Sequence, residues 1–152
     1  MKNPWSDRWA FVKDYIPNNV SIVDFGCGNR EVLDYVTPSR YLGVDRVDTA
    51  DIVADLDQPL QINDTFDLGL LLGVLEYLED PERTLNNVVG YASEFVIVTL
   101  VAKKKPEWRQ AFDDNSIDQL LRKFFRTVEH HRHGRYILSV CKNETNSNFY
   151  RV

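Results

Sequence analysis

Three aspartates stand in or at the ends of short apolar runs, and two glycines follow the first of them. Asp24 lies in the run VSIVDFGCGNR, with Gly26 and Gly28 just after it. Asp45 and Asp55 close the next two runs, YLGVD and DIVAD. Carboxylates accept hydrogen bonds from hydroxyl and amino groups, and glycine lets the main chain approach a ligand closely. We therefore expect the three carboxylates to converge on a nucleotide-type ligand beside the glycine turn.

The spacing of the first two aspartates fits one strand–helix–strand unit. Asp45 follows Asp24 by 21 residues, which places an acid at the tip of the second strand, where a carboxylate can accept both hydroxyls of a ribose. The plainer alternative is a solvated acid in a loop. Only residues 46–50 separate Asp45 from the third run, which is too short for a helical crossover. Either that helix has shrunk to a turn, or the third strand is a vestigial edge.

Hydrophobic periodicity predicts alternating strands and helices, closed by an antiparallel hairpin. The run 66–72 is continuously apolar, as in a strand buried on both faces of a parallel sheet. Asp80 is expected to cap the helix that Pro81 begins. Ser116 is expected to cap a later helix, with Gln119 completing a capping box. The expected strands are 20–25, 41–44, 51–54, 66–72, 94–101, 126–132 and 135–142, and the expected helices are 5–16, 31–36, 82–92, 107–112 and one from 116.

Length and composition favour a single domain and exclude several classes of partner. The 152 residues are expected to form one domain, with an N-terminal helix within 1–19, a core over 20–142 and a polar tail over 143–152. The net charge of −5, from 18 basic and 23 acidic residues, argues against broad binding of nucleic acid or anionic membranes. The apolar runs are too short to insert into a membrane and the N-terminus lacks the order of a signal peptide, so we expect a cytoplasmic protein. The two cysteines match no metal or redox motif and are expected to be reduced thiols.

Four segments resemble, in their order along the chain, the motifs of class I S-adenosylmethionine-dependent methyltransferases, close to their type-11 branch: VDFGCGNR, YLGVD, DIVADL and FDLGLLLGVLEYLEDPERTL. The resemblance covers residues 21–100, and the closing hairpin agrees with it. It implies a Rossmann-like α/β fold, with a seven-stranded, mostly parallel sheet, an antiparallel last strand beside the fifth, helices on both faces and abbreviated connections around strand 3. It also implies S-adenosylmethionine as cofactor and S-adenosylhomocysteine as product.

The same resemblance implies cofactor-binding roles at the ends of the first four strands. The glycine turn would hold the methionine end of the cofactor, and the tip of the second strand would hold the ribose hydroxyls. The end of the third strand would meet the adenine, and the end of the fourth would pass beneath the reactive sulfonium. In that order the residues are Asp24, Phe25, Gly26, Cys27 and Gly28; Asp45 and Arg46; Asp55 and Leu56; and Leu72 and Gly73.

Two positions depart from the family's pattern. Arg30 stands where a third glycine is usual. Its partner would be either the carboxylate of the cofactor, which makes Arg30 a further candidate cofactor ligand, or a group of the protein itself. Tyr77 stands where histidine is frequent, so a mechanism that uses the family's histidine is not expected here.

Methyl transfer from a sulfonium is an in-line displacement, so the enzyme mainly holds the acceptor atom behind the methyl carbon. An alcohol acceptor gains from a general base, whereas an amine reacts once solvent has deprotonated it. The candidates for a catalytic role are Glu76, which we prefer as the base, Tyr77, His131 and His133. No pair of histidines has the spacing and the neighbouring ligands that are typical of a metal site. We expect O-methylation, in preference to N-methylation, of a small molecule or a sugar or glycan. The basic run 103–105 is either a solvated loop or a contact for an anionic acceptor.

Two other functions fit part of the pattern. An NAD-dependent oxidoreductase needs the motif GxGxxG, and Glu31 stands at its third glycine. A non-catalytic interaction or regulatory domain could keep the same fold. The short connection between the second and third strands and the presence of Arg30 favour this alternative. The identity of the acceptor and the oligomeric state do not follow from these residues.

Overall fold

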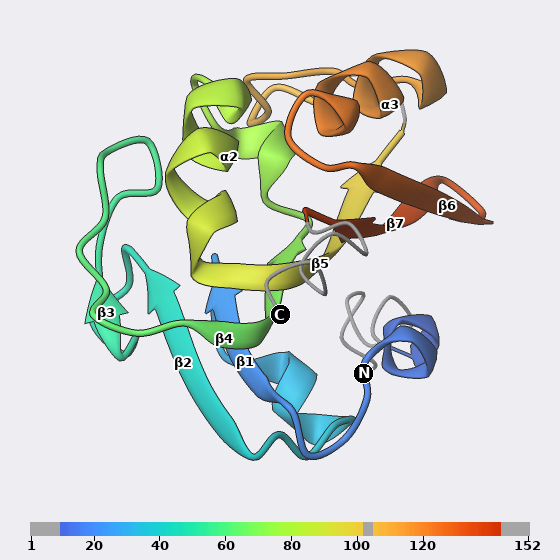
Figure 1. Cartoon of the computed structure of the whole chain (residues 1–152). Coiled ribbons are helices and arrows are strands. Elements are labelled where there is room, and N and C mark those ends of the chain that lie inside the picture. The colour runs from blue at the N-terminus through green and yellow to red at the C-terminus, as the bar shows by residue number, and fades with distance from the viewer. Residues whose placement is uncertain (1–9, 102–104, 144–152) are drawn as a thin grey trace, which may run out of the picture.

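The computed structural model describes residues 10–101 and 105–143; the predictions for residues 5–9, for Lys103 and Lys104 and for the tail from 144 onward lie outside them. A seven-stranded mixed sheet forms the centre of the molecule, in the order β3-β2-β1-β4-β5-β7-β6 (Figure 1). This sheet confirms the predicted fold class. The strands are β1 (Ser21–Phe25), β2 (Arg40–Asp45), β3 (Ile52–Val53), β4 (Phe66–Leu72), β5 (Ala92–Leu100), β6 (Thr127–His133) and β7 (Tyr136–Lys142).

The directions of the strands create a crevice in which a ligand can bind. The first five strands run parallel to one another, and β7 runs antiparallel between β5 and β6. The chain moves outward from β1 through β2 to β3 and then returns to β4, on the other side of β1. The connections after β1 and after β4 therefore lead to opposite sides of the sheet. Ligands of open α/β sheets bind at such a point, beyond the carboxyl ends of the strands.

Short helices cover both faces of the sheet. Residues 10–12 are helical and lead into 3-10 helices and two α-helices: η1 (Lys13–Tyr15), η2 (Glu31–Asp34), η3 (Leu75–Tyr77), α2 (Pro81–Val88), η4 (Val89–Tyr91) and α3 (Asp114–Arg122). α2 and α3 cover one face, and η2 and the N-terminal helical residues cover the other (Figure 1). On the face under α2 and α3, Phe25 and Phe95 are fully buried and stack with ring centroids 6.3 Å apart. None of the described helices is long and apolar enough to cross a membrane.

The two α-helices begin at aspartate caps. Asp80 accepts a hydrogen bond from the backbone N–H of Arg83 at 3.0 Å, with Pro81 as the first helical residue, as predicted. The prediction that Ser116 caps α3 is wrong, because Asp113 is the N-cap and Ser116 is the third helical residue. The Asp113 carboxylate accepts from the Ser116 N–H at 2.7 Å, and the Ser116 hydroxyl accepts from the Asp113 N–H at 2.9 Å. The reciprocal box is therefore present, three residues earlier than the sequence indicated.

The segment 107–112, which the sequence predicts to be helical, has no helical turn. Its backbone N–H groups at Arg109 and Gln110 both donate to the carbonyl oxygen of Glu76, at 2.8 and 3.1 Å. The Gln110 side chain adds hydrogen bonds to the carbonyl oxygens of Leu78 and Glu79. These hydrogen bonds hold the segment, which we call the strap, against η3 and the residues that follow it.

The connection between β2 and β3 is a tight turn, and β3 itself is an edge of two residues. The turn is closed by the N–H of Ala50 donating to the carbonyl of Val47 at 3.2 Å. Asp51 then places its carboxylate beside β2 and accepts the N–H of Gly43 at 2.8 Å. A side chain thus satisfies a backbone donor that a longer β3 would have paired. Both alternatives that the sequence left open are realised together, since the helix is replaced by a turn and the strand is vestigial.

Candidate cofactor and active site

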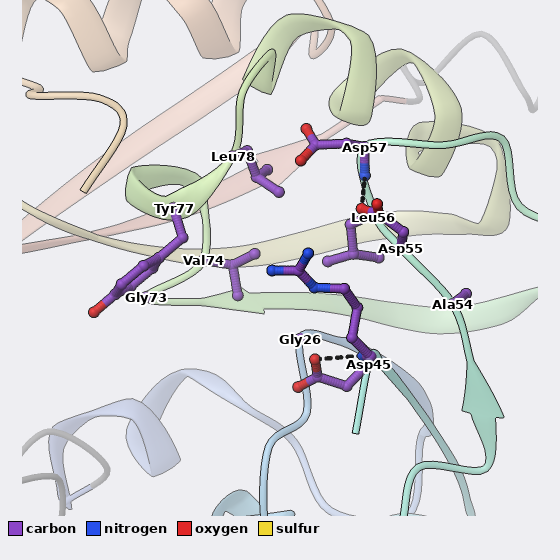
Figure 2. Close-up of a pocket in the computed structure, with 11 residues that line it drawn as sticks. Gly26, Asp45, Ala54, Asp55, Leu56, Asp57, Gly73, Val74, Tyr77 and Leu78 are labelled. Atoms are coloured by element: carbon purple, nitrogen blue, oxygen red, sulfur yellow. Dashed lines mark hydrogen bonds between the residues drawn. The ribbon is translucent and has the colours of Figure 1, made fainter. Parts of the chain in front are cut away.

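A cavity of about 270 Å³ lies beyond the carboxyl ends of β1, β2 and β4 (Figure 2). Four successive parts of the chain form its wall: the turn after β1, the tip of β2, the segment after β3 and the exit of β4. The strand order reverses at this point, so the cavity occupies the position at which open α/β sheets bind ligands. The lining residues are Gly26, Asp45, Arg46, Ala54, Asp55, Leu56, Asp57, Gly73, Val74, Tyr77 and Leu78.

The turn after β1 presents bare backbone to this cavity. Gly26 has φ +82°, and a Cβ at this position would lie 2.5 Å from Cγ2 of Val74. Both the conformation and the contact therefore require glycine. The N–H groups of Gly26 and Cys27 donate to the carbonyl of Val44 at 2.7 and 3.2 Å, which fastens the turn to the end of β2. Gly28 also has a positive φ of +51°.

Asp45, at the tip of β2, has both carboxylate oxygens held by backbone donors. Oδ2 accepts the N–H of Gly28 at 2.8 Å, and Oδ1 accepts the N–H of Arg46 at 2.7 Å. A carboxylate has about four acceptor sites, so two remain for a ligand. The carboxylate therefore lines the cavity in a fixed orientation, with the capacity to accept two hydroxyl groups.

Asp24 lies beneath the glycine turn and does not line the cavity. Its carboxyl is 3% exposed and accepts a hydrogen bond from the Tyr41 hydroxyl at 2.6 Å. Burial raises the pKa of Asp24 to about 7, and the nearby charge of Asp45 adds to this rise, while the Tyr41 hydrogen bond and the Arg30 charge oppose it. Of the three aspartates expected to converge, Asp45 and Asp55 reach the cavity wall, whereas the Asp24 carboxyl is buried against Tyr41.

The segment after β3 is held to the exit of β4 by a carboxylate that the sequence analysis did not single out. Asp57 donates its N–H to Asp55 Oδ1 at 2.9 Å. Asp57 Oδ1 in turn accepts the N–H groups of Glu79 and Asp80, at 3.1 and 3.4 Å. The sequence Asp55-Leu56-Asp57 could have indicated a second acid near the cavity. The partners of Asp57, however, lie more than twenty residues further along the chain. Ala54, Val74 and Leu78 also line the cavity without having been predicted.

Apolar side chains cover part of the cavity. In Figure 2, Leu56 and Val74 lie between Asp55 on one side and Tyr77 on the other. The backbone of Leu56 is fixed by the fully buried Thr84 of α2, whose hydroxyl donates to the Leu56 carbonyl at 2.8 Å. The cavity therefore combines an apolar surface for a flat ring with carboxylates for hydroxyl and amino groups.

The charges around the cavity favour a ligand that carries positive charge. Its wall has the carboxylates of Asp45, Asp55 and Asp57 against the guanidinium of Arg46. The helix after the glycine turn, η2, has four residues and carries acidic groups in its first turn. Such a short, acid-rich helix offers a diphosphate little of the positive potential that a longer helix N-terminus supplies.

Arg30 has a partner within the protein. Its backbone is left-handed, with φ +60°, and its guanidinium donates to the Thr49 carbonyl at 2.7 Å and to Asp51 Oδ1 at 3.0 Å. Three further predicted cofactor residues, Phe25, Cys27 and Leu72, are buried and do not line the cavity. The predicted roles of these residues in cofactor binding stay predictions.

The predicted catalytic residues on η3 occupy different environments. Tyr77 lines the cavity and is 40% exposed. Glu76 is 2% exposed, its Oε1 accepts the N–H of Leu100 at 3.3 Å, and it does not line the cavity. Tyr77 is therefore the member of this pair that can meet a molecule in the cavity directly.

His131 and His133 pack against the N-terminal helical residues. Phe11 stacks on His133 with ring centroids 4.2 Å apart, and Tyr15 lies 4.7 Å from the His131 ring. The Tyr15 hydroxyl is also 3.3 Å from His133 Nε2. Neither histidine lines the cavity. Within residues 10–101 and 105–143, no group of three His, Cys, Asp or Glu side chains could hold a metal ion.

The chain matches the family model described as "Methyltransferase domain" over residues 1–137, so it belongs to this methyltransferase family. A comparison with curated protein sequences finds no match.

Solved structures of methyltransferases share the fold at low sequence identity. The 1,6-didemethyltoxoflavin-N1-methyltransferase of Burkholderia thailandensis, solved with 1,6-didemethyltoxoflavin and S-adenosylhomocysteine, is 16% identical with a TM-score of 0.71, over 92% of this chain and 78% of that one. The N-methyltransferase NodS of Bradyrhizobium japonicum, solved with S-adenosylhomocysteine, is 15% identical with a TM-score of 0.70, over 95% and 90% of the two chains. An S-adenosylmethionine-dependent methyltransferase of Mesorhizobium loti is 18% identical with a TM-score of 0.66, over 90% and 98%.

The sheet order, the antiparallel β7 and the family match together define the class of the protein. It is a class I, S-adenosylmethionine-dependent methyltransferase. The class predicted from the four motifs is confirmed, whereas the type-11 branch stays a prediction.

Proposed function

We propose that this chain binds S-adenosylmethionine in the cavity beyond β1, β2 and β4 and transfers its methyl group to a small-molecule acceptor. The observation that carries the proposal is that the Asp45 carboxylate and the bare backbone of Gly26 line one cavity, at the reversal of the strand order. The carboxylate suits a ribose diol, and the glycine turn leaves room for a ligand against the main chain.

Each part of the cavity wall takes one part of the cofactor in this proposal. Asp45 accepts from the ribose hydroxyls with the acceptor sites that Gly28 and Arg46 leave free. Asp55 accepts from the adenine amino group, and Leu56 packs on the adenine ring. Gly26, in the turn after β1, meets the methionine end, and Gly73, at the exit of β4, lies beneath the sulfonium.

The bound cofactor would supply an electrophilic methyl carbon on a positively charged sulfur. The chain contributes orientation, because a displacement needs the acceptor atom in line behind that carbon. The excess of carboxylates around the cavity favours a cationic ligand electrostatically. Asp57 and Thr84 hold the adenine wall, so this part of the site is fixed before the cofactor arrives.

We place the acceptor on the side of the cavity where Tyr77 lies. Tyr77 and Asp55 occupy opposite sides of the cavity (Figure 2), so an acceptor beside Tyr77 approaches from the end remote from the adenine. The Burkholderia N1-methyltransferase, solved with 1,6-didemethyltoxoflavin, supports a small-molecule acceptor. For this chain we propose an oxygen atom of a small molecule, sugar or glycan, with Tyr77 as the neighbouring polar group.

Calorimetric titration tests the cofactor proposal without knowledge of the acceptor. We expect S-adenosylmethionine and S-adenosylhomocysteine to bind, and NAD not to bind. Asp45→Ala should weaken binding by about 1–3 kcal/mol, the cost of leaving polar groups unmatched. Asp64→Ala is the control, because Asp64 precedes β4 at the opposite end of the strands and pairs with Arg40.

The outcomes separate the candidate functions. Selective binding of S-adenosylmethionine, lost in Asp45→Ala and kept in Asp64→Ala, supports the proposal. Binding of NAD alone would support the oxidoreductase, and binding of neither would support a non-catalytic domain. Once an acceptor is found, transfer of a ¹³C-labelled methyl group identifies the acceptor atom, since the carbon chemical shift distinguishes a methoxy from an N-methyl group.

A further inference from the structure

An ion pair joins the glycine turn after β1 to the connection between β2 and β3. The guanidinium of Arg30 donates to the Thr49 carbonyl at 2.7 Å and to Asp51 Oδ1 at 3.0 Å. The other oxygen of Asp51 accepts the N–H of Gly43 at 2.8 Å, and Gly43 lies in β2 two residues before Asp45. One carboxylate thus bridges the turn and the strand that carries the ribose-binding candidate.

The gain in folding stability from this pair is small. Both side chains are 33% exposed, and ion pairs at such sites contribute little because water and salt screen them. Arg30 also holds a left-handed backbone, with φ +60°, which a non-glycine residue adopts at a cost. A glycine at position 30 would be free of that strain. Folding stability therefore does not account for an arginine at position 30 paired with Asp51.

The pair is placed where it can fix the geometry of the cavity. The N–H of Arg30 donates to the Cys27 carbonyl at 2.8 Å, so the position of Arg30 sets the shape of the turn. The same turn donates the Gly28 N–H to Asp45 at 2.8 Å. In this chain a short turn replaces the helix between β2 and β3, and the Arg30–Asp51 pair secures that turn.

We propose that Arg30 and Asp51 are positioning residues for the cofactor, an inference that rests on the proposed function. Arg30 acts through Asp51 and Thr49 to hold the glycine turn against the tip of β2, so that Gly26 and Asp45 face the cavity together. It does this without contact with the cofactor. The alternative is that Arg30 leaves Asp51 and binds the carboxylate of S-adenosylmethionine directly.

Four variants distinguish positioning from direct binding and from general destabilisation. Arg30→Gly removes the guanidinium and relieves the backbone strain. Asp51→Asn removes the charge but keeps an oxygen for the Gly43 N–H. The double variant Arg30→Gly/Asp51→Asn measures whether the two act as one unit, and Arg30→Lys restores a charge beside Asp51. Arg40→Ala is the matched control, because Arg40 also pairs with an aspartate, Asp64, and donates to the carbonyl of a threonine, Thr65, at the start of β2.

We expect Arg30→Gly and Asp51→Asn each to weaken S-adenosylmethionine binding about tenfold in calorimetric titration, the double variant to lose no more than either, and Arg30→Lys to recover part of the loss. In the cofactor-free protein, the Gly28 amide should exchange with deuterium faster in both single variants than in the wild type. The midpoint of urea unfolding should not fall in Arg30→Gly, and Arg40→Ala should bind as the wild type does.

Three results would overturn the inference. If Asp51→Asn binds normally while Arg30→Gly does not, Arg30 contacts the cofactor directly. If all variants bind as the wild type, the pair has no part in the site. If the wild type itself fails to bind S-adenosylmethionine, the proposed function falls and this inference falls with it, which the first titration reveals before any variant is measured.

Discussion

The backbone N–H of Gly28 donates to the carboxylate of Asp45 across 2.8 Å, so the turn after β1 and the tip of β2 form one unit. Because the donor belongs to the main chain, this contact depends on the shape of the turn as well as on the Asp45 side chain. Substitutions that deform the turn should therefore change the orientation of the Asp45 carboxylate. Substitutions at the neighbouring residues test which contacts maintain the shape of the cavity.

The contact between Gly26 and Val74 predicts a large effect of one methyl group. We expect Gly26→Ala to destabilise the fold by about 2–4 kcal/mol, because the new Cβ would lie 2.5 Å from Cγ2 of Val74 at a backbone with φ +82°. Gly134→Ala is the control, since Gly134 has φ +61° in the hairpin and open space around it, so only the backbone strain of about 1 kcal/mol applies. Urea unfolding measures both. Equal losses would show that the contact with Val74 relaxes freely.

The buried carboxyl of Asp24 predicts a dependence of stability on pH. Burial raises its pKa from 3.8 to about 7, so between these values the folded protein keeps a proton that the unfolded chain has lost. The free energy of unfolding should therefore fall as the pH rises from about 4 to about 7, by on the order of 4 kcal/mol from this group.

Asp24→Asn isolates this contribution, because the amide oxygen can still accept from Tyr41 but does not ionise. We expect the variant to lose much of the decline in stability with pH that the wild type shows, so the difference between the two proteins should widen toward pH 7. Urea unfolding at a series of pH values measures it. Parallel curves for the two proteins would contradict the raised pKa.

Thr84 on α2 predicts a link between that helix and Leu56, which we propose packs on the adenine ring. Thr84→Val removes the hydroxyl that donates to the Leu56 carbonyl at 2.8 Å and leaves a buried acceptor without a partner. We expect a loss of about 1–3 kcal/mol in the free energy of unfolding and weaker binding of S-adenosylmethionine in calorimetry. Thr99→Val is the control: Thr99 is fully buried, and its hydroxyl has no hydrogen-bond partner among the described residues. That variant should be neutral or stabilising.

The different environments of Tyr77 and Glu76 predict different effects of substituting these two adjacent residues. Methyl transfer can be followed from labelled S-adenosylmethionine to a low-molecular-weight cell extract. We expect Tyr77→Ala to reduce transfer while leaving the unfolding free energy within about 0.5 kcal/mol of the wild type, because the side chain is half-exposed and lines the cavity. Glu76→Gln keeps an oxygen for the Leu100 N–H and should transfer methyl at nearly the wild-type rate. A loss of about 10²-fold or more in Glu76→Gln would instead support the base role inferred from the sequence.

The central strands could be located from the sequence because they are continuous apolar runs. The residues 66–72 read as a strand buried on both faces, and β4 occupies those residues at the centre of the sheet. The aspartate at the tip of β2 was placed by spacing alone, because strand–helix–strand units have a narrow range of lengths. Apolar runs and spacing therefore located the central strands and part of the cavity wall, whereas the seven-stranded sheet was implied by the resemblance of the four motifs to a known family.

Contacts between distant segments could not be predicted in the same way. Asp57 acquires its partners from Glu79 and Asp80, and Glu76 is buried because β5 and the strap after it close over η3. The cap of α3 was displaced because Asp113 and Ser116 are both good capping residues, and the choice between them depends on where the preceding strap ends. Such outcomes are decided by tertiary packing and not by local preference.

The carbonyl oxygen of Glu76 receives the N–H groups of both Arg109 and Gln110, so one backbone atom joins the chain leaving β4 to the strap that approaches α3. Tyr77 follows Glu76 directly. The main chain that carries the phenol ring is therefore held by the strap as well as by β4. The acceptor side of the proposed site thus rests on two segments that lie far apart in the sequence.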